Sequence, residues 1–225
     1  QSAHPDGFGA TAPLASGGRQ MIDRLILPAQ RLLMAGPARL LAARGVGADQ
    51  VTLAGLCVGV FCFAALALGW TALGLVLLAL NRFMDGLDGA IARLDGPTDR
   101  GAFLDIAADF LFYALVPLGF AFADPAANAL PAAALIAAFV GTGSSFLAYA
   151  VIAAKRGMVA DAYPAKGIYY LGGLTEGAET IGFFIAMCFW PSAFALLAWV
   201  FALLCLVTIV MRMHIGWATF EMKHD

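Results

Sequence analysis

Six long apolar runs dominate the pattern of hydrophobic and polar positions along this chain. They span residues 51–69, 71–92, 102–122, 129–153, 167–189 and 192–212. Each run holds about 19 residues or more, which is enough for a helix to cross a hydrocarbon core of ~30 Å. The pattern therefore predicts an all-α fold, a polytopic membrane protein with six transmembrane helices.

The segment before the first run, residues 21–44, interleaves leucines and isoleucines with charged residues. Three of its four arginines, Arg24, Arg31 and Arg39, follow one another at steps of seven and eight residues. Such steps keep them on one helical face, and Pro28 and Pro37 should break the segment into pieces. We expect an amphipathic interfacial helix with its basic face toward anionic headgroups. An ordinary solvated helix face would show the same pattern.

The first twenty residues differ in composition from the rest of the chain. Residues 1–20 are rich in Gly, Ala, Ser and Pro and lack periodicity. We interpret them as a disordered tail or an expression remnant, with Met21 as a natural start and no signal peptide. Residues 21–225 then form a single membrane domain.

The distribution of positive charge predicts the orientation in the membrane. The connections after residues 69, 122 and 189 hold no Lys or Arg, whereas the loops 93–101 and 154–166 and both terminal regions carry them. Because cytoplasmic loops are enriched in Lys and Arg, this asymmetry puts both termini and these two loops in the cytoplasm. We expect a multi-pass protein of a bacterial inner (cytoplasmic) membrane.

Composition excludes several classes of protein. The chain is 62% hydrophobic and 12% charged, far more apolar than a soluble globular chain at about 45–50%. A net charge of −2 gives no electrostatic basis for binding nucleic acid. The four cysteines lie in apolar runs without Cys-x-x-Cys spacing, so we interpret them as small buried residues and not as ligands or disulfides.

Four aspartates near the middle of the chain are the strongest chemical signal. Asp85 and Asp88 are three residues apart, and Asp105 and Asp109 are four apart. On helices these spacings put each pair on one face, so two facing helices would bring four carboxylates together. Like charges repel strongly at short range, so the cluster requires cations. One or two hard divalent ions are expected, and Mg²⁺ suits carboxylate oxygens best.

The depth of these aspartates also matters. The second apolar run is interrupted toward its end by Asn81, Arg82, Asp85 and Asp88. Ionisable groups within a membrane normally face a bundle interior or a water-filled cavity, since exposure to lipid is costly. The sequence therefore predicts a polar pocket that opens to the cytoplasm and is sunk into the bilayer.

The aspartates belong to a longer motif, Asp-x-x-Asp-Gly-x-x-Ala-Arg followed by Gly-x-x-x-Asp-x-x-x-Asp. Its fixed positions are Asp85, Asp88, Gly89, Ala92, Arg93, Gly101, Asp105 and Asp109. The motif resembles the signature of the CDP-alcohol phosphotransferase family, and the resemblance extends over about residues 21–220, toward a bacterial inner-membrane subgroup. It implies six transmembrane helices, a homodimer, and metal-dependent transfer of a substituted phosphate from a CDP-linked donor to a hydroxyl, with CMP leaving.

The resemblance also implies roles for the aspartates. Asp85, Asp88 and Asp105 would be ligands of two Mg²⁺ ions, or of Mn²⁺ in their place, which clamp the attacking and leaving oxygens. Asp109 would also touch the second metal and take the proton from the attacking hydroxyl.

The remaining signature residues are assigned to the nucleotide. Gly89 and Gly101 leave room for close approach, and Ala92 belongs to the same set as a fixed residue of the signature. Arg93 offers a bidentate pair to phosphate, and Thr98 matches a hydroxyl that contacts the nucleotide in the family. The alternatives are helix packing for the glycines and a topology-setting charge for Arg93.

A weaker match lies at the start of the first run. The family often shows Pro-Asn-x-x-Thr there, whereas this chain has Ala48, Asp49 and Thr52 at the matching positions. We assign Asp49 and Thr52 to the nucleotide site. Asp49 would otherwise be a helix N-cap.

The acceptor pocket is expected around the fifth run, where the chain departs from glycerol-phosphate-using relatives. Glu176 and Glu179 are three residues apart in apolar surroundings and are expected to face the cavity. They would hydrogen-bond a polyol or an ammonium group, or form a structural buried pair. Lys166 and Arg212 would bind an acceptor's phosphate or set the topology.

The leading hypothesis is an enzyme of phospholipid synthesis that uses CDP-diacylglycerol as donor and a small alcohol or lipid as acceptor. One alternative is an aminoalcohol phosphotransferase that uses CDP-choline or CDP-ethanolamine with a lipid acceptor. Another is a carboxylate-lined cation transporter, which is disfavoured because residues 51–122 and 129–212 show no internal similarity. An inactive scaffold is disfavoured by the intact carboxylates.

Overall fold

The computed structural model describes residues 33–158 and 177–221, and within these ranges the chain is helical and contains no strand. A short helix, Leu33–Ala43, comes first. The following elements are α2 Ala48–Ala67, α3 Thr71–Asp95, α4 Asp99–Ala123, α5 Pro125–Lys155, α6 Gly177–Phe189, the 3-10 turn η1 Pro191–Ala193 and α7 Phe194–Glu221.

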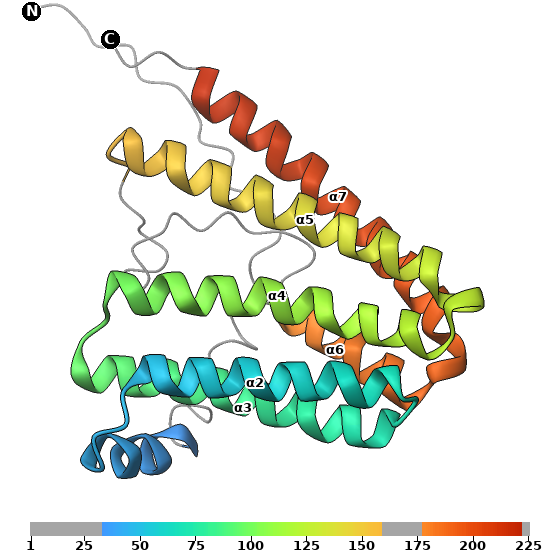
Figure 1. Cartoon of the computed structure of the whole chain (residues 1–225). Helices are drawn as coiled ribbons and strands as arrows, with labels where there is room; N and C mark the ends of the chain where they lie inside the picture. Colours follow the sequence, from blue (N-terminus) through green and yellow to red (C-terminus); the bar gives the residue numbers. More distant parts are fainter. Residues whose placement is uncertain (1–32, 159–176, 222–225) are drawn as a thin grey trace, which may run out of the picture.

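The long helices run side by side and reverse direction at each connection (Figure 1). α2 packs against both α3 and α4, α4 packs against α5, and α5 packs against α7. α6 touches α3 and α7. The α3–α4 connection lies at one end of the bundle, while the α2–α3 and α4–α5 connections lie at the other (Figure 1). Since α2 contacts both helices of the aspartate motif, it forms the third wall of the candidate site.

Four helical stretches in the described residues are long and apolar enough to cross a membrane. These are α2, α4, α5 and the stretch Pro191–Glu221 that joins η1 to α7. α3 is 25 residues long, but its second half is interrupted by charged residues, and α6 has 13 described residues. The predicted class of an all-helical membrane protein is confirmed.

The ends of the helices differ from the predicted apolar runs in places. α2 begins at Ala48 and α4 at Asp99, each ahead of its run, and α7 continues past residue 212 to Glu221. Backbone hydrogen bonding extends a helix beyond the apolar part, because it does not depend on side-chain hydropathy. Residues 167–176 of the fifth run lie outside the described residues.

Two expectations about single residues are wrong. The helix Leu33–Ala43 continues through Pro37, where a break was predicted. The proline ring holds φ near the helical value, so the helix tolerates it at the loss of one backbone hydrogen bond. Cys57 is exposed on the apolar surface of α2, whereas Cys62, Cys188 and Cys205 are buried as predicted.

A dense aromatic core joins α4, α6 and α7. Phe112 and Phe120 of α4, Phe184 of α6, and Phe194 and Phe201 of α7 are almost completely buried. The rings of Phe120 and Phe194 stack with centroids 4.5 Å apart. This core fixes the rotation of α4 about its axis and thereby decides which of its side chains face α3.

One glycine shows how closely α2 and α4 approach. A Cβ atom on Gly119 would lie 2.7 Å from Cβ of Leu66 and 3.1 Å from the carbonyl oxygen of Phe63. No larger residue fits there without moving the backbone, and small residues at helix contacts are the usual means of close packing in membranes.

Candidate active site

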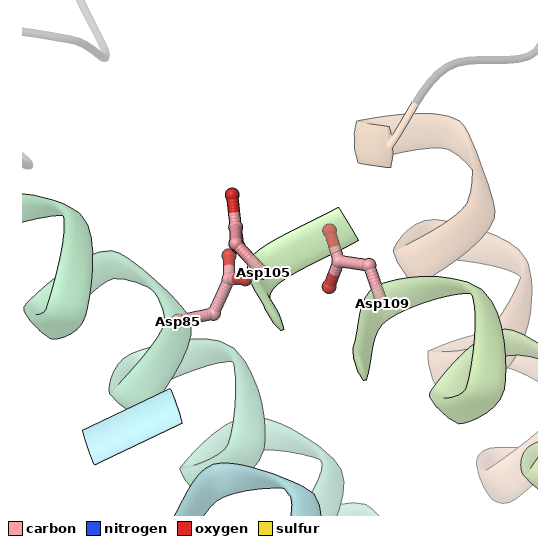
Figure 2. A group of neighbouring side chains, drawn as sticks. All are labelled: Asp85, Asp105 and Asp109. Carbon is pink, nitrogen blue, oxygen red and sulfur yellow. The ribbon is translucent and has the colours of Figure 1, made fainter. Parts of the chain in front are cut away.

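Three of the four motif aspartates converge between α3 and α4. One carboxylate oxygen from each of Asp85, Asp105 and Asp109 lies within 4.8 Å of the others. Figure 2 shows Asp85 extending from α3 toward the two aspartates of α4. Hard carboxylate oxygens at this separation suit a divalent cation such as Mg²⁺ or Mn²⁺, which also relieves their mutual repulsion. The chemistry of the donor set therefore fits the expected metals.

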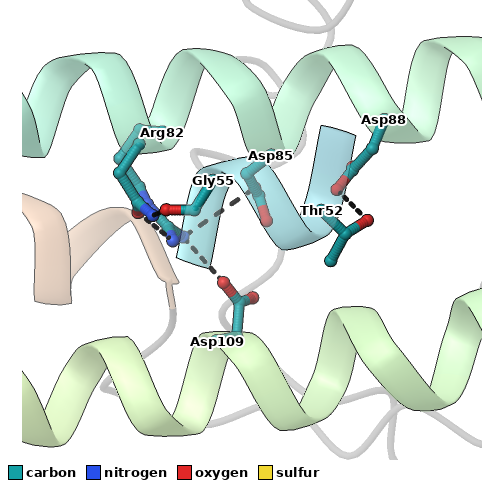
Figure 3. A network of polar contacts seen from close by, with 7 residues as sticks. Thr52, Gly55, Arg82, Asp85, Asp88 and Asp109 are labelled. Carbon is teal, nitrogen blue, oxygen red and sulfur yellow. Dashed lines mark hydrogen bonds and ion pairs between the residues drawn. The ribbon is translucent and has the colours of Figure 1, made fainter. Parts of the chain in front are cut away.

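Asp88 lies on the same face of α3 but has a different partner. Its side chain is buried, and its Oδ2 accepts a hydrogen bond of 2.6 Å from the Thr52 hydroxyl of α2 (Figure 3). Thr52 was predicted to contact the nucleotide; in the structure it lines the cleft and holds a motif carboxylate. This hydrogen bond fixes the position of the Asp88 carboxylate at the boundary between α2 and α3.

Arg82 also enters the cluster, although it had no predicted role in the site. Its Nη1 donates a 2.9 Å hydrogen bond to Oδ1 of Asp109 and lies 3.8 Å from Oδ2 of Asp85 (Figure 3). The proximity of Arg82 to Asp85 could have been predicted from the sequence, because Arg82 precedes Asp85 by three residues and so shares its helical face. The neighbouring Asn81 donates from Nδ2 to the Gly55 carbonyl of α2 at 2.8 Å.

These residues surround a small, partly open cleft between α2, α3 and α4, which we name the acidic cleft. It is lined by Thr52, Gly55, Leu56, Asn81, Arg82, Asp85, Asp88, Asp105, Ala108 and Asp109. A polar cleft with all four aspartates on its wall is therefore present, while its depth in the bilayer and its cytoplasmic opening stay predictions.

The beginnings of α2 and α4 bring three predicted nucleotide residues together. Thr98 caps α4, and its hydroxyl oxygen accepts a 3.0 Å hydrogen bond from the Gly101 amide. A Cβ on Gly101 would lie 3.1 Å from Oγ1 of Thr98 and 3.2 Å from Oδ1 of Asp49. Asp49 accepts a 2.6 Å hydrogen bond from Nε of Arg100. The N-cap of α2 is Gly47, so the alternative of Asp49 as the cap is wrong.

The other predicted nucleotide residues lie on the last turns of α3. Arg93 is exposed and Ala92 is partly buried. A Cβ on Gly89 would meet Nη1 of Arg93 at 3.5 Å and no other described atom within 4 Å. The space beside Gly89 is therefore open toward an exposed guanidinium, but these three residues do not line the acidic cleft itself.

The predicted acceptor residues are only partly within the described ranges. Lys166 and Glu176 lie outside them. Glu179 is partly buried in the first turn of α6. Arg212 is buried on α7, where its Nη1 donates a 3.0 Å hydrogen bond to the Thr142 carbonyl of α5. Neither residue lines the acidic cleft.

Most of the sequence matches a known protein family. Residues 46–211 match the model of the CDP-alcohol phosphatidyltransferase family. The chain is 49% identical over 201 residues to the inner membrane protein YnjF of Escherichia coli strain K12, covering 89% of this chain and 98% of that protein. A shorter match of 73 residues, 41% identical, covers 32% of this chain and 37% of an archaetidylinositol phosphate synthase from Methanothermobacter thermautotrophicus.

Solved structures share the fold. Phosphatidylinositol phosphate synthase PgsA1 of Mycobacterium tuberculosis with CDP-DAG bound matches with a TM-score of 0.61 at 24% identity, over 82% of this chain and 93% of that chain. The same protein in complex with manganese and citrate gives a TM-score of 0.63 at 24% identity, over 82% of this chain and 88% of that chain.

The match thus extends over both helices that carry the aspartates and over the α2 wall of the acidic cleft. The sequence identity with an inner membrane protein extends over nearly the whole of that protein, and it agrees with the presence of several helices long and apolar enough to cross a membrane. The chain is a multi-pass membrane enzyme that belongs to the CDP-alcohol phosphatidyltransferase family.

Proposed function

We propose that this enzyme transfers a phosphatidyl group from CDP-diacylglycerol to the hydroxyl of an acceptor alcohol and releases CMP. The observation that carries the proposal is the convergence of Asp85, Asp105 and Asp109 within 4.8 Å at the wall of the acidic cleft. A pyrophosphate donor needs this kind of cation-binding centre. The CDP-DAG complex of a protein with the same fold supports the choice of donor.

In this reaction the acceptor oxygen attacks the phosphorus that bears the diacylglycerol. A new P–O bond forms, and the bond to the bridging oxygen of CMP breaks, so CMP leaves with the electron pair. Asp109 accepts the proton of the attacking hydroxyl. Phosphoryl transfer needs little covalent help from the protein, so positioning and charge neutralisation account for most of the catalysis.

Asp85, Asp88, Asp105 and Asp109 would hold two divalent ions, Mg²⁺ or Mn²⁺, which supply neutralising charge at the pyrophosphate. Asp88 lines the cleft with one of its oxygens held by Thr52. The manganese complex of the structurally similar PgsA1 supports a divalent ion of this type.

The nucleotide half of the donor would lie where α2 and α4 begin. Asp49, Thr98 and Gly101 gather there, and Gly101 has no side chain to block approach. Thr52 would act on the nucleotide side of the cleft through Asp88. Gly89, Ala92 and Arg93, at the end of α3, would contact the phosphates of the donor.

The acceptor would bind on the side of α6 and α7, near Lys166, Glu176, Glu179 and Arg212. The glutamates favour hydroxyl-rich or amine-bearing acceptors, since both can donate hydrogen bonds to a carboxylate. For a phosphate-bearing acceptor to bind, the positive charge of Lys166 or Arg212 would have to outweigh the repulsion between the phosphate and the glutamates.

We also propose the membrane arrangement. Residues 21–225 form one domain with six transmembrane helices, in which α3 and the helix containing α6 complete the set. The acidic cleft and both termini face the cytoplasm, and the segment 21–44 lies at the interface. Met34 and Ala38 of that segment are buried against Val51 and Ile91, which supports a docked helix. The enzyme works as a homodimer, the state that the family resemblance implies.

The decisive experiment is CMP release by the purified protein with a panel of CDP-linked donors and alcohols. We expect turnover with CDP-diacylglycerol and Mg²⁺ or Mn²⁺, and loss of turnover in excess chelator. Turnover with CDP-choline or CDP-ethanolamine alone would show that the donor is wrong. Full turnover in chelator would contradict the metal assignment. Cation flux into liposomes without CMP release would favour a transporter.

A further inference from the structure

Arg82 is a cation that the fold builds into the acidic cleft. Among the described residues that line the cleft, the other charged side chains are all carboxylates. The Arg82 side chain is only 17% exposed. Its charge therefore interacts with the aspartates through a poorly screened environment, where charge–charge energies are larger than at a surface.

The guanidinium is held from several sides that do not involve the aspartates. Oδ1 of Asn81 accepts hydrogen bonds from Nε at 2.9 Å and from Nη2 at 2.5 Å. Asn81 is itself buried, and its Nδ2 donates a hydrogen bond to the Gly55 carbonyl of α2. The guanidinium also lies over the Phe112 ring, with 4.7 Å from Cζ to the ring centroid. The position of the charge is therefore set by α2, α3 and α4 together.

The Arg82 guanidinium makes the two carboxylate oxygens of Asp109 inequivalent, because it bonds to only one of them. Nη1 donates to Oδ1 of Asp109 at 2.9 Å, so Oδ1 is occupied and Oδ2 is left for an incoming group. A carboxylate pinned at one oxygen cannot rotate freely, which is the condition for presenting a base in one geometry. The same positive charge lies 3.8 Å from Asp85 and therefore repels any divalent cation that binds at the cluster.

We propose that Arg82 is a positioning residue that orients Asp109 through Oδ1 and at the same time weakens divalent cation binding at the cluster. The catalytic part of this inference rests on the proposed phosphatidyl transfer. The metal part concerns only the residues of the cleft and is measured without any substrate.

The test measures Mn²⁺ affinity of the full-length purified protein by calorimetry or electron paramagnetic resonance, beside the kinetics of CMP release. In Arg82→Gln we expect Mn²⁺ to bind about tenfold more tightly, because a nearby positive charge is gone. We expect kcat to fall about 100-fold, because Asp109 is no longer held. The KM for the donor should stay within a few-fold.

Arg82→Lys separates charge from geometry. It keeps the positive charge but cannot reproduce the planar contacts to Asn81 and Asp109. We expect a Mn²⁺ dissociation constant close to that of the wild type and a reduced kcat. Arg39→Gln is the matched control, since it removes one exposed arginine outside the cleft and should change neither quantity.

The outcomes distinguish this inference from the proposed function. Weaker or unchanged Mn²⁺ binding in Arg82→Gln, with a wild type that binds Mn²⁺ and releases CMP, would overturn the role of Arg82 alone. A purely structural arginine would weaken metal binding and lower kcat together. A wild type that neither binds Mn²⁺ nor releases CMP would contradict the proposed function and the inference with it. If Arg82→Gln fails to fold, the expected split between affinity and kcat in Arg82→Lys remains a test.

Discussion

The two halves of α4 have opposite characters, although they belong to one continuous helix. Its first turns carry Asp105 and Asp109, which face α3 across the acidic cleft. Its later turns carry Phe112, Val116 and Phe120, each at most 2% exposed in the aromatic core. One rotation of α4 about its axis serves both halves, because residues spaced by about seven positions return to the same face.

The physical difference lies in what each half can tolerate. Aromatic side chains gain from close packing, so the core half buries its rings almost completely. Carboxylates repel one another, so the polar half keeps an open cleft bridged by Arg82 and fitted for cations. We therefore expect activity and stability to be separable along the same helix, and variants in each half test this expectation.

The largest effect on activity is expected in the polar half. Asp109→Asn removes the proposed base and keeps the shape of the side chain, so kcat should fall by at least about 10³-fold. Donor binding should stay largely intact, because Asp109 serves mainly the incoming hydroxyl. The measurement is CMP release beside calorimetric binding of CDP-diacylglycerol. Asp85→Asn is the comparison variant and should weaken both, and equal loss of binding in the two variants would contradict the division of roles.

The largest effect on stability is expected in the core half. Phe120→Ala removes a ring stacked on Phe194 and leaves a cavity, which should destabilise the fold by about 3 kcal/mol. The fraction that stays folded should keep its kcat. The checks are thermal unfolding in detergent and activity per folded molecule. Phe122→Ala is the matched control, since Phe122 lies on the same helix and is 63% exposed, and a comparable loss there would show that burial is not the cause.

An intermediate effect is expected at the contact between α2 and α3. Thr52→Val keeps the shape of the side chain but removes the 2.6 Å hydrogen bond to Asp88. Hydrogen bonds to charged groups contribute about 1.5–3 kcal/mol, so we expect a loss of roughly tenfold or more in kcat/KM for the donor. Thr52→Ser retains the hydroxyl and should behave like the wild type. An unchanged kcat/KM in Thr52→Val would show that the hydrogen bond to Asp88 does not matter.

The smallest effect is expected outside the cleft. Glu179→Gln on α6 removes a charge and keeps the shape, and should change the KM for the acceptor by a few-fold. The donor dissociation constant should stay unchanged, because Glu179 does not line the acidic cleft. The measurement is the KM for the acceptor in the same preparation, beside the donor dissociation constant. If only the folding yield drops, Glu179 is structural and the proposed acceptor role is wrong.

Much of this protein could be predicted from local patterns. Apolar runs of sufficient length indicated the helices, and spacings of three and four residues placed Asp85 with Asp88 and Asp105 with Asp109. The motif identified the family. Helix ends were less predictable, as α7 shows by continuing to Glu221, because polar residues continue a helix as readily as apolar ones once backbone hydrogen bonds are available.

The sequence by itself determined which residues share a face within each helix, because that follows from the helical repeat. The tertiary structure alone decided which faces meet. It paired Asp88 with Thr52 of α2, set Arg82 against Asp109 of α4, and gathered Asp49 with Gly101 at the entrance of two helices. These contacts depend on the rotation and depth of separate helices, which the aromatic core and the close approach at Gly119 fix through packing between segments far apart in the chain.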